Sequence, residues 1–120
     1  MRVFAPHRIG FVGVKHRLLD TPAEKVPHEF AQEVIDFCKP IDAITTAWVG
    51  LTEITEDFQH PYEQLAAAFE LTSDDDAHLQ LVADRFYAAM PEDVQAGGCN
   101  VLDPGGVAVW SKQAQRVFHR

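Results

Sequence analysis

The sequence predicts an α+β domain of the ferredoxin-like kind, with two helices on one face of an antiparallel sheet and a short helix near the C-terminus. Two observations lead to this fold class. The candidate elements follow the order β-α-β-β-α-β, which is the order of a split βαβ sandwich. Both long helical segments carry one apolar stripe, so each has one face to bury. With 120 residues and no internal repeat, we expect a single domain over residues 1–120.

The opening elements are a strand and a helix. Residues 9–14, IGFVGV, form a short apolar run that predicts a strand. Pro27 suits the first turn of a helix, where its missing N–H costs nothing, and this helix should extend to about Cys38. Phe30 and Val34 recur with Cys38 at helical spacing, and they predict its buried side.

The middle of the chain contains two candidate strands. Residues 41–54 are rich in β-branched side chains and therefore predict a long strand. Apolar groups lie on both of its faces, with Trp48 on one and Val49 on the other, which suggests a central strand or a face used for contact. Residues 62–71 fit a strand by their alternation and a helix by three consecutive alanines, so the pattern alone leaves both open.

The second helix has the clearest signals in the chain. Ser73 is expected to be its N-cap, and Asp74, Asp75 and Asp76 follow at the positive end of the helix dipole. Pro91 is expected to end it. Its apolar stripe consists of Leu79, Val82, Phe86 and Met90.

The C-terminal part predicts a short strand over residues 99–102, a short helix over 107–115 and a tail over 117–120. We expect this segment to be ordered and docked. Trp110 and Phe118 can each bury roughly 150–250 Å². Only anchors of that size offset the entropy of ordering a chain end.

Composition excludes some partners. The chain has 18 acidic and 10 basic residues, and its net charge of −8 opposes nucleic acid and favours basic partners. No apolar run approaches the roughly 18–20 residues of a membrane span, and the N-terminus lacks a signal-peptide layout. We therefore expect a cytoplasmic protein with no membrane partner, in which Cys38 and Cys99 are free thiols.

Catalytic and metal chemistry find little support in the sequence. None of the six histidines stands in a zinc-ligand spacing, and Asp74–Asp76 with His78 are explained by helix capping. Cys99 is better interpreted as a buried thiol than as a nucleophile, and Cys38 as core. The glycine-rich stretch 97–106 lacks the spacing of a phosphate-binding loop. We expect no catalytic residue, no cofactor and no bound metal. The histidines are His7, His16, His28, His60, His78 and His119.

The leading hypothesis is a non-catalytic protein-binding module that acts through an exposed sheet face and the C-terminal segment. Its partner would be another protein or a second copy in a homodimer. At the end of the chain, His119 and Arg120 are expected to stay polar and to be able to meet an acidic group. The candidate contact residues are Trp48, Phe58, Tyr62, Trp110, Phe118 and Arg120.

Two further hypotheses stay open. An acidic inhibitor, such as an immunity protein, would neutralise a basic toxin or enzyme through charge complementarity. A small metal- or ligand-binding enzyme would need polar side chains to converge, for example His60 and His78.

The order of motifs is also informative. LLDTPAEKVPHEF precedes the first helix, ITTAWVGLTEI and YEQLAAAFEL follow it, and TSDDDAHLQLVADRF begins the second helix. Over residues 12–120 this order resembles the C-terminal domain of the enhanced-serine-sensitivity (SseB) family. The resemblance implies a strand at 62–71 and transfers no catalytic residue. Two positions of the family's aromatic and basic tail differ, being Val117 and His119 here, and the family's larger N-terminal domain has no counterpart in these residues.

Overall fold

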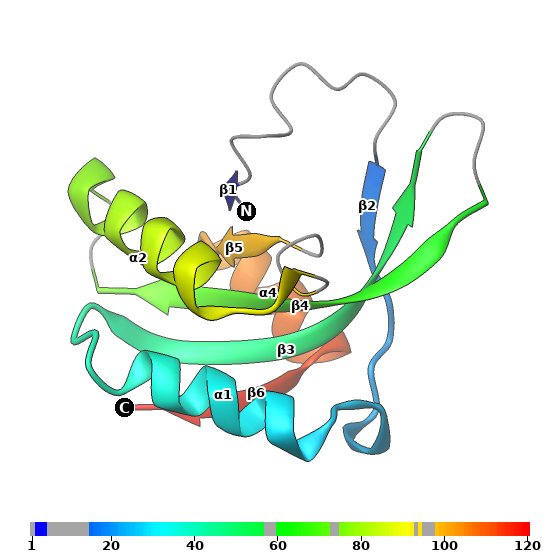
Figure 1. Cartoon of the computed structure of the whole chain (residues 1–120), viewed down its shortest axis with the longest axis horizontal. Coiled ribbons are helices and arrows are strands. Elements are labelled where there is room, and N and C mark those ends of the chain that lie inside the picture. Colours follow the sequence, from blue (N-terminus) through cyan, green and yellow to red (C-terminus); the bar gives the residue numbers. More distant parts are fainter. Residues whose placement is uncertain (1, 5–14, 57–59, 73–74, 93, 95–97) are drawn as a thin grey trace.

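A computed structural model describes residues 2–4, 15–56, 60–72, 75–92, 94 and 98–120. Its elements form one mixed sheet with helices on both faces (Figure 1). The strands are β1 (Arg2–Phe4), β2 (Lys15–Leu18), β3 (Ile44–Thr55), β4 (Tyr62–Leu71), β5 (Cys99–Val101) and β6 (Gln115–His119). The helices are the 3-10 helix η2 (Ala23–Lys25) and the α-helices α1 (His28–Cys38), α2 (Asp76–Ala89) and α4 (Pro104–Gln113).

The sheet is organised around β3. Its strands follow the order β1-β5-β4-β3-β2, and β6 also pairs with β3. β2 pairs with residues 52–55 of β3 and β6 with residues 46–49, so these two strands share one edge of β3. β4 occupies the other edge along most of its length.

The α+β class is confirmed, but the sheet is not antiparallel throughout as expected. β4 and β5 pair in parallel, joined by the crossover through α2. The ferredoxin-like strand order is not confirmed, because β5 forms hydrogen bonds directly with β4. The expected first strand at 9–14 lies outside the described residues.

α1 and α2 enclose the larger hydrophobic core on one face of the sheet, as expected. Phe37 of α1, Phe69 of β4 and Phe86 of α2 form an aromatic cluster at its centre. The centroid of the Phe37 ring lies 5.5 Å from that of the Phe69 ring and 6.1 Å from that of the Phe86 ring. Cys38 and Cys99 are both buried in this core.

The opposite face of the sheet is covered by α4 (Figure 1). Trp48 of β3 is 3% exposed and Trp110 of α4 is 1% exposed, and both belong to this second core. The expectation of an open face at Trp48 is therefore wrong. Leu102, Ala66 and Ala68 complete the packing, and the small alanine side chains let the helix lie close to the sheet.

Four local expectations need correction or completion. Residues 62–71 form a strand, which settles the ambiguous pattern. Asp75 rather than Ser73 caps α2, because its carboxylate accepts the His78 backbone N–H at 3.0 Å; Ser73 lies outside the described residues. α4 begins at Pro104, capped by the Asp103 carboxylate, which accepts the Gly106 N–H at 2.7 Å. The expected tail is strand β6.

Candidate functional site

Thr21 fastens the end of β2 to both β3 and α4. Its hydroxyl donates to the Leu19 carbonyl at 2.9 Å and accepts the Leu51 N–H at 2.9 Å. Its backbone N–H donates to the Gln113 carbonyl at 2.7 Å, and its carbonyl accepts from the Gln115 side chain at 2.9 Å. Thr21 is almost fully buried, so these bonds are not exchanged with water. They fix the distance between β2 and α4.

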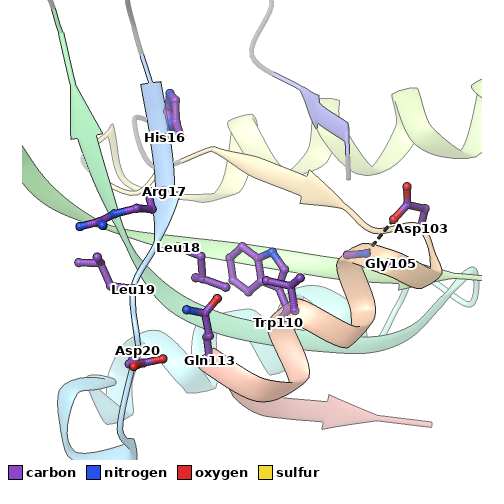
Figure 2. A pocket seen from close by; sticks show the side chains of 11 residues that line it. His16, Arg17, Leu18, Leu19, Asp20, Asp103, Gly105, Trp110 and Gln113 are labelled. Carbon is purple, nitrogen blue, oxygen red and sulfur yellow. Dashed lines mark hydrogen bonds between the residues drawn. The ribbon is translucent and has the colours of Figure 1, made fainter.

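Between β2 and α4 lies a groove with a volume of about 750 Å³. Five consecutive residues, 16–20, form one side, and one face of α4 forms the other. Figure 2 shows Leu18 beside Trp110, against which it packs, while Arg17 points away from α4. The full lining consists of His16, Arg17, Leu18, Leu19, Asp20, Asp103, Gly105, Gly106, Val109, Trp110 and Gln113.

The groove combines an apolar wall with polar ends. Val109 is 49% exposed, one of two large apolar side chains that are exposed in the described part of the chain. Arg17 forms an ion pair with Glu53 at 3.2 Å, but both groups face solvent and the pair contributes little. The Gly106 N–H bonded to Asp103 lowers the pKa of that carboxyl, which stays ionised. A groove of this kind can take a chain with apolar and hydrogen-bonding groups.

The C-terminal segment is anchored through Arg120. Its Nε donates to the Ile44 carbonyl at 2.8 Å, and its Nη2 donates to the carbonyls of Cys38 at 2.8 Å and Ile41 at 2.9 Å. The guanidinium thus satisfies carbonyls at the C-terminal end of α1, where a cation is also favoured by the helix dipole. The partners of Arg120 are therefore backbone carbonyls and not the acidic group that the sequence allows for. The guanidinium also lies 5.2 Å from the centroid of the Phe118 ring.

A polar row crosses three strands on the α4 side of the sheet. The Thr46 hydroxyl lies 3.2 Å from Glu70 Oε1 and 3.1 Å from His119 Nδ1. The hydroxyl donates to the carboxylate, which leaves only its lone pairs to face the imidazole nitrogen. None of the three residues lines the groove described above.

The candidate contact residues named from the sequence fall into separate places. Trp48 and Trp110 are core residues, of which Trp110 also forms the floor of the groove. Phe118 and Arg120 lie beside α1, half-buried and exposed respectively. Tyr62 is half-buried at the start of β4, with its hydroxyl 3.4 Å from a Glu56 carboxylate oxygen. Phe58 lies outside the described residues.

The structure also places the two thiols and His78. Burial raises the pKa of the Cys38 thiol to about 12 and raises the pKa of Cys99 further, so both thiols stay neutral near pH 7. The prediction that both cysteines are buried free thiols is confirmed. His78 Nδ1 lies 2.9 Å from the Asp75 carboxylate within the helix cap. Across the described ranges, no three His, Cys, Asp or Glu side chains gather closely enough to hold a metal ion.

Sequence reasoning missed the residues that build the groove. Residues 16–20 carry no motif, and nothing in the sequence around Thr21 marks it as a buried connection. The face of α4 offers one weak signal, since Gly106, Trp110 and Gln113 recur at helical spacing and therefore share one side of the helix. The groove arises from a contact between segments more than eighty residues apart, which local patterns do not encode.

Comparison with known proteins gives no relative: no family model matches this chain, and neither does any curated protein or solved structure. Among the helices that the structure describes, none is long and apolar enough to cross a bilayer.

Proposed function

We propose that this chain is a non-catalytic protein-binding module that holds an extended segment of a partner protein in the groove between β2 and α4. The observation that carries the proposal is the groove itself. It has a volume of about 750 Å³, follows five consecutive residues of the chain and exposes the apolar Val109 at its rim.

The edge of β2 supports an extended partner. Within the described residues, β2 is the last strand on its path through the sheet and pairs with β3. The Leu19 N–H bonds to the Leu51 carbonyl, and backbone groups alternate in direction along an antiparallel strand. The backbone groups of Leu18 therefore point away from β3. A partner segment that lies along this edge would pair with them by strand addition.

The α4 side would provide selectivity. Val109 offers an apolar surface, and the Gln113 amide offers a donor and an acceptor. Because side chains of an extended segment alternate in direction, one partner side chain would contact Val109 while its neighbours face solvent or the Gln113 end. We expect the contacted partner residue to be apolar.

Charge favours a basic partner. The net charge of −8 attracts basic segments and opposes nucleic acid and anionic membrane surfaces.

A cytoplasmic location and membership of the SseB family, through its C-terminal domain, belong to the same proposal and rest on the sequence features that led to them.

A peptide selection tests the proposal. Peptides are selected from a random displayed library on the wild-type protein, and their affinities are then measured for Val109→Asp and Leu81→Asp. Leu81 is the matched control, because it is the other exposed large apolar residue and lies on α2. We expect at least tenfold weaker binding to the Val109 variant, about 1.4 kcal/mol, and unchanged binding to the Leu81 variant. Failure to select any peptide, or equal losses in both variants, would contradict the proposal.

The homodimer version is decided by native mass spectrometry. A wild-type dimer that Val109→Asp converts to a monomer would make the occupant a second copy of this chain. A dimer that is insensitive to this substitution would assign self-association to another surface.

The acidic inhibitor is the second candidate function, and the helical face favours it. α1 and α2 lie on the face of the sheet opposite α4 (Figure 1), and both helices carry exposed carboxylates. A basic partner would associate with them at a rate that falls steeply with ionic strength. Stopped-flow measurement of that rate at several salt concentrations tests this candidate. The residues concerned are Glu29, Glu33, Asp36, Asp76 and Asp84.

A further inference from the structure

A second cavity lies between the C-terminal ends of α1 and α2, on the opposite side of the sheet from the α4 groove. It has a volume of about 300 Å³. Its lining is almost entirely apolar, with one charged residue, Arg85. The lining residues are Phe37, Pro40, Ile41, Arg85, Ala88 and Ala89. This volume lies at the lower end of the range for ligand pockets and is enough for one leucine-sized or aromatic side chain.

The floor and one wall of this cavity are held rigidly. Phe37 is fixed by its ring contacts with Phe69 and Phe86 in the core. The turn that carries Pro40 and Ile41 is fixed by the Arg120 guanidinium, which donates to the Ile41 carbonyl at 2.9 Å. A partner would not have to order these groups, so little affinity is lost to conformational entropy.

The wall formed by α2 consists of small side chains. Ala88 and Ala89 are exposed, and any longer residue there would fill the space over Phe37. The cavity is therefore open because α2 carries alanine at both positions, and one larger side chain at either position would close it.

Four exposed carboxylates lie close in sequence to the cavity lining. Asp36 directly precedes Phe37 and Asp42 follows Ile41, while Asp84 lies one helical turn before Ala88 and Glu92 comes three residues after Ala89. Two cations lie among them: Lys39, which pairs with Asp36 at 3.7 Å, and Arg85. The rim thus carries a net negative charge around an apolar centre. A complementary partner presents an apolar side chain between basic residues.

From these features we infer that the cavity between α1 and α2 is a docking site for a basic segment of a partner protein, which inserts one large apolar side chain over Phe37. The site is distinct from the β2–α4 groove, but the inference rests on the proposal that the chain binds proteins. The same acidic rim disfavours an anionic membrane or a nucleic acid as the occupant.

The experiment uses a synthetic probe. A lysine–leucine peptide that forms an amphipathic basic helix is titrated into the full chain, and binding is followed by fluorescence anisotropy and by NMR shifts of the Phe37, Ala88 and Ala89 amides. A lysine–alanine peptide of equal length and charge measures attraction by charge alone. We expect the leucine peptide to bind at least tenfold more tightly and to shift these three amides.

Paired variants separate the cavity from the general charge of the protein. Ala88→Lys fills and charges the cavity, whereas Ala77→Lys adds the same charge on the exposed first turn of α2. We expect at least a tenfold loss of affinity for the Ala88 variant and less than a twofold loss for the Ala77 variant, with melting temperatures confirming that both are folded. Arg85→Glu should tighten binding.

Several results would overturn the inference: no binding of the leucine peptide, equal binding of the alanine peptide, or equal losses in the two lysine variants. Such a failure is distinguishable from failure of the proposed function, because peptides selected on the β2–α4 groove respond to Val109→Asp and not to Ala88→Lys.

Discussion

Gly50 of β3 and Trp110 of α4 are so close that a β-carbon on Gly50 would lie 3.1 Å from Trp110 Cζ3. The same β-carbon would lie 3.1 Å from Ala114 Cβ and 2.8 Å from Leu18 Cδ1. Glycine at this position is therefore what allows α4 to pack onto the sheet, and the position of α4 in turn defines the groove. The contact joins the second core to the proposed site.

Gly50→Ala is expected to destabilise the protein by about 1–3 kcal/mol, because overpacking forces the Trp110 ring or the sheet to move. Gly105→Ala is the control, since its β-carbon would meet nothing closer than 3.5 Å and alanine favours the helix. Urea denaturation measures both. Equal stability of the Gly50 variant and the wild type would show that α4 does not pack as closely as described.

Thr21→Val is expected to cost about 1–3 kcal/mol, because it removes the hydroxyl that accepts the Leu51 N–H and leaves that buried donor unsatisfied. Thr21→Ser should restore most of the loss. Hydrogen exchange at the Leu51 amide is the direct measurement, and it should become faster only in the valine variant. Unchanged protection in that variant would remove Thr21 from its role in fixing the groove.

Arg120→Ala is expected to lower the free energy of unfolding by about 1–3 kcal/mol, since carbonyls at the end of α1 lose a charged donor. Arg116→Ala on the same strand is the control, as its side chain is exposed. Truncation after Gln115 removes β6 and should lower the melting temperature further. A truncated chain that melts like the wild type would contradict the docking of this segment.

The buried thiols predict a loss of stability at alkaline pH. The pKa of Cys38 is raised from 9.0 to about 12 in the folded protein, so its contribution to stability is fully present below pH 9.0 and declines as pH rises toward about 12. In that window each thiol should contribute a slope of about 1.4 kcal/mol per pH unit. Denaturation of wild type and Cys38→Ala at several pH values gives the two slopes. Parallel slopes would show that Cys38 ionises equally in the folded and unfolded protein.

The sequence predicted the elements whose signals are local. α1 follows from the spacing of Phe30, Val34 and Cys38, and β3 follows from its β-branched run. The alternation in residues 62–71 competed with alanine propensity, and pairing along β3 decided in favour of a strand. β6 was not predicted, because five residues after a helix have too little pattern to indicate a strand.

The residues of the candidate site could not be predicted from local sequence patterns, because long-range contacts bring them together. Arg120 reaches carbonyls about eighty residues earlier in the chain, and Thr21 bonds to residues on three other segments. Such contacts depend on the strand order, which the sequence predicted only in part. The sequence analysis names the two tryptophans as candidate contact residues. In the structure, their large side chains instead pack in the second core.

Hydrogen exchange at the Leu18 amide, with and without a peptide selected on the groove, tests the central claim most directly. If a partner segment adds to the edge of β2, exchange at Leu18 should slow at least tenfold on binding. Exchange at Arg17, whose backbone faces β3, should change little. A peptide that binds tightly while the Leu18 amide exchanges at its original rate would contradict strand addition in the β2–α4 groove.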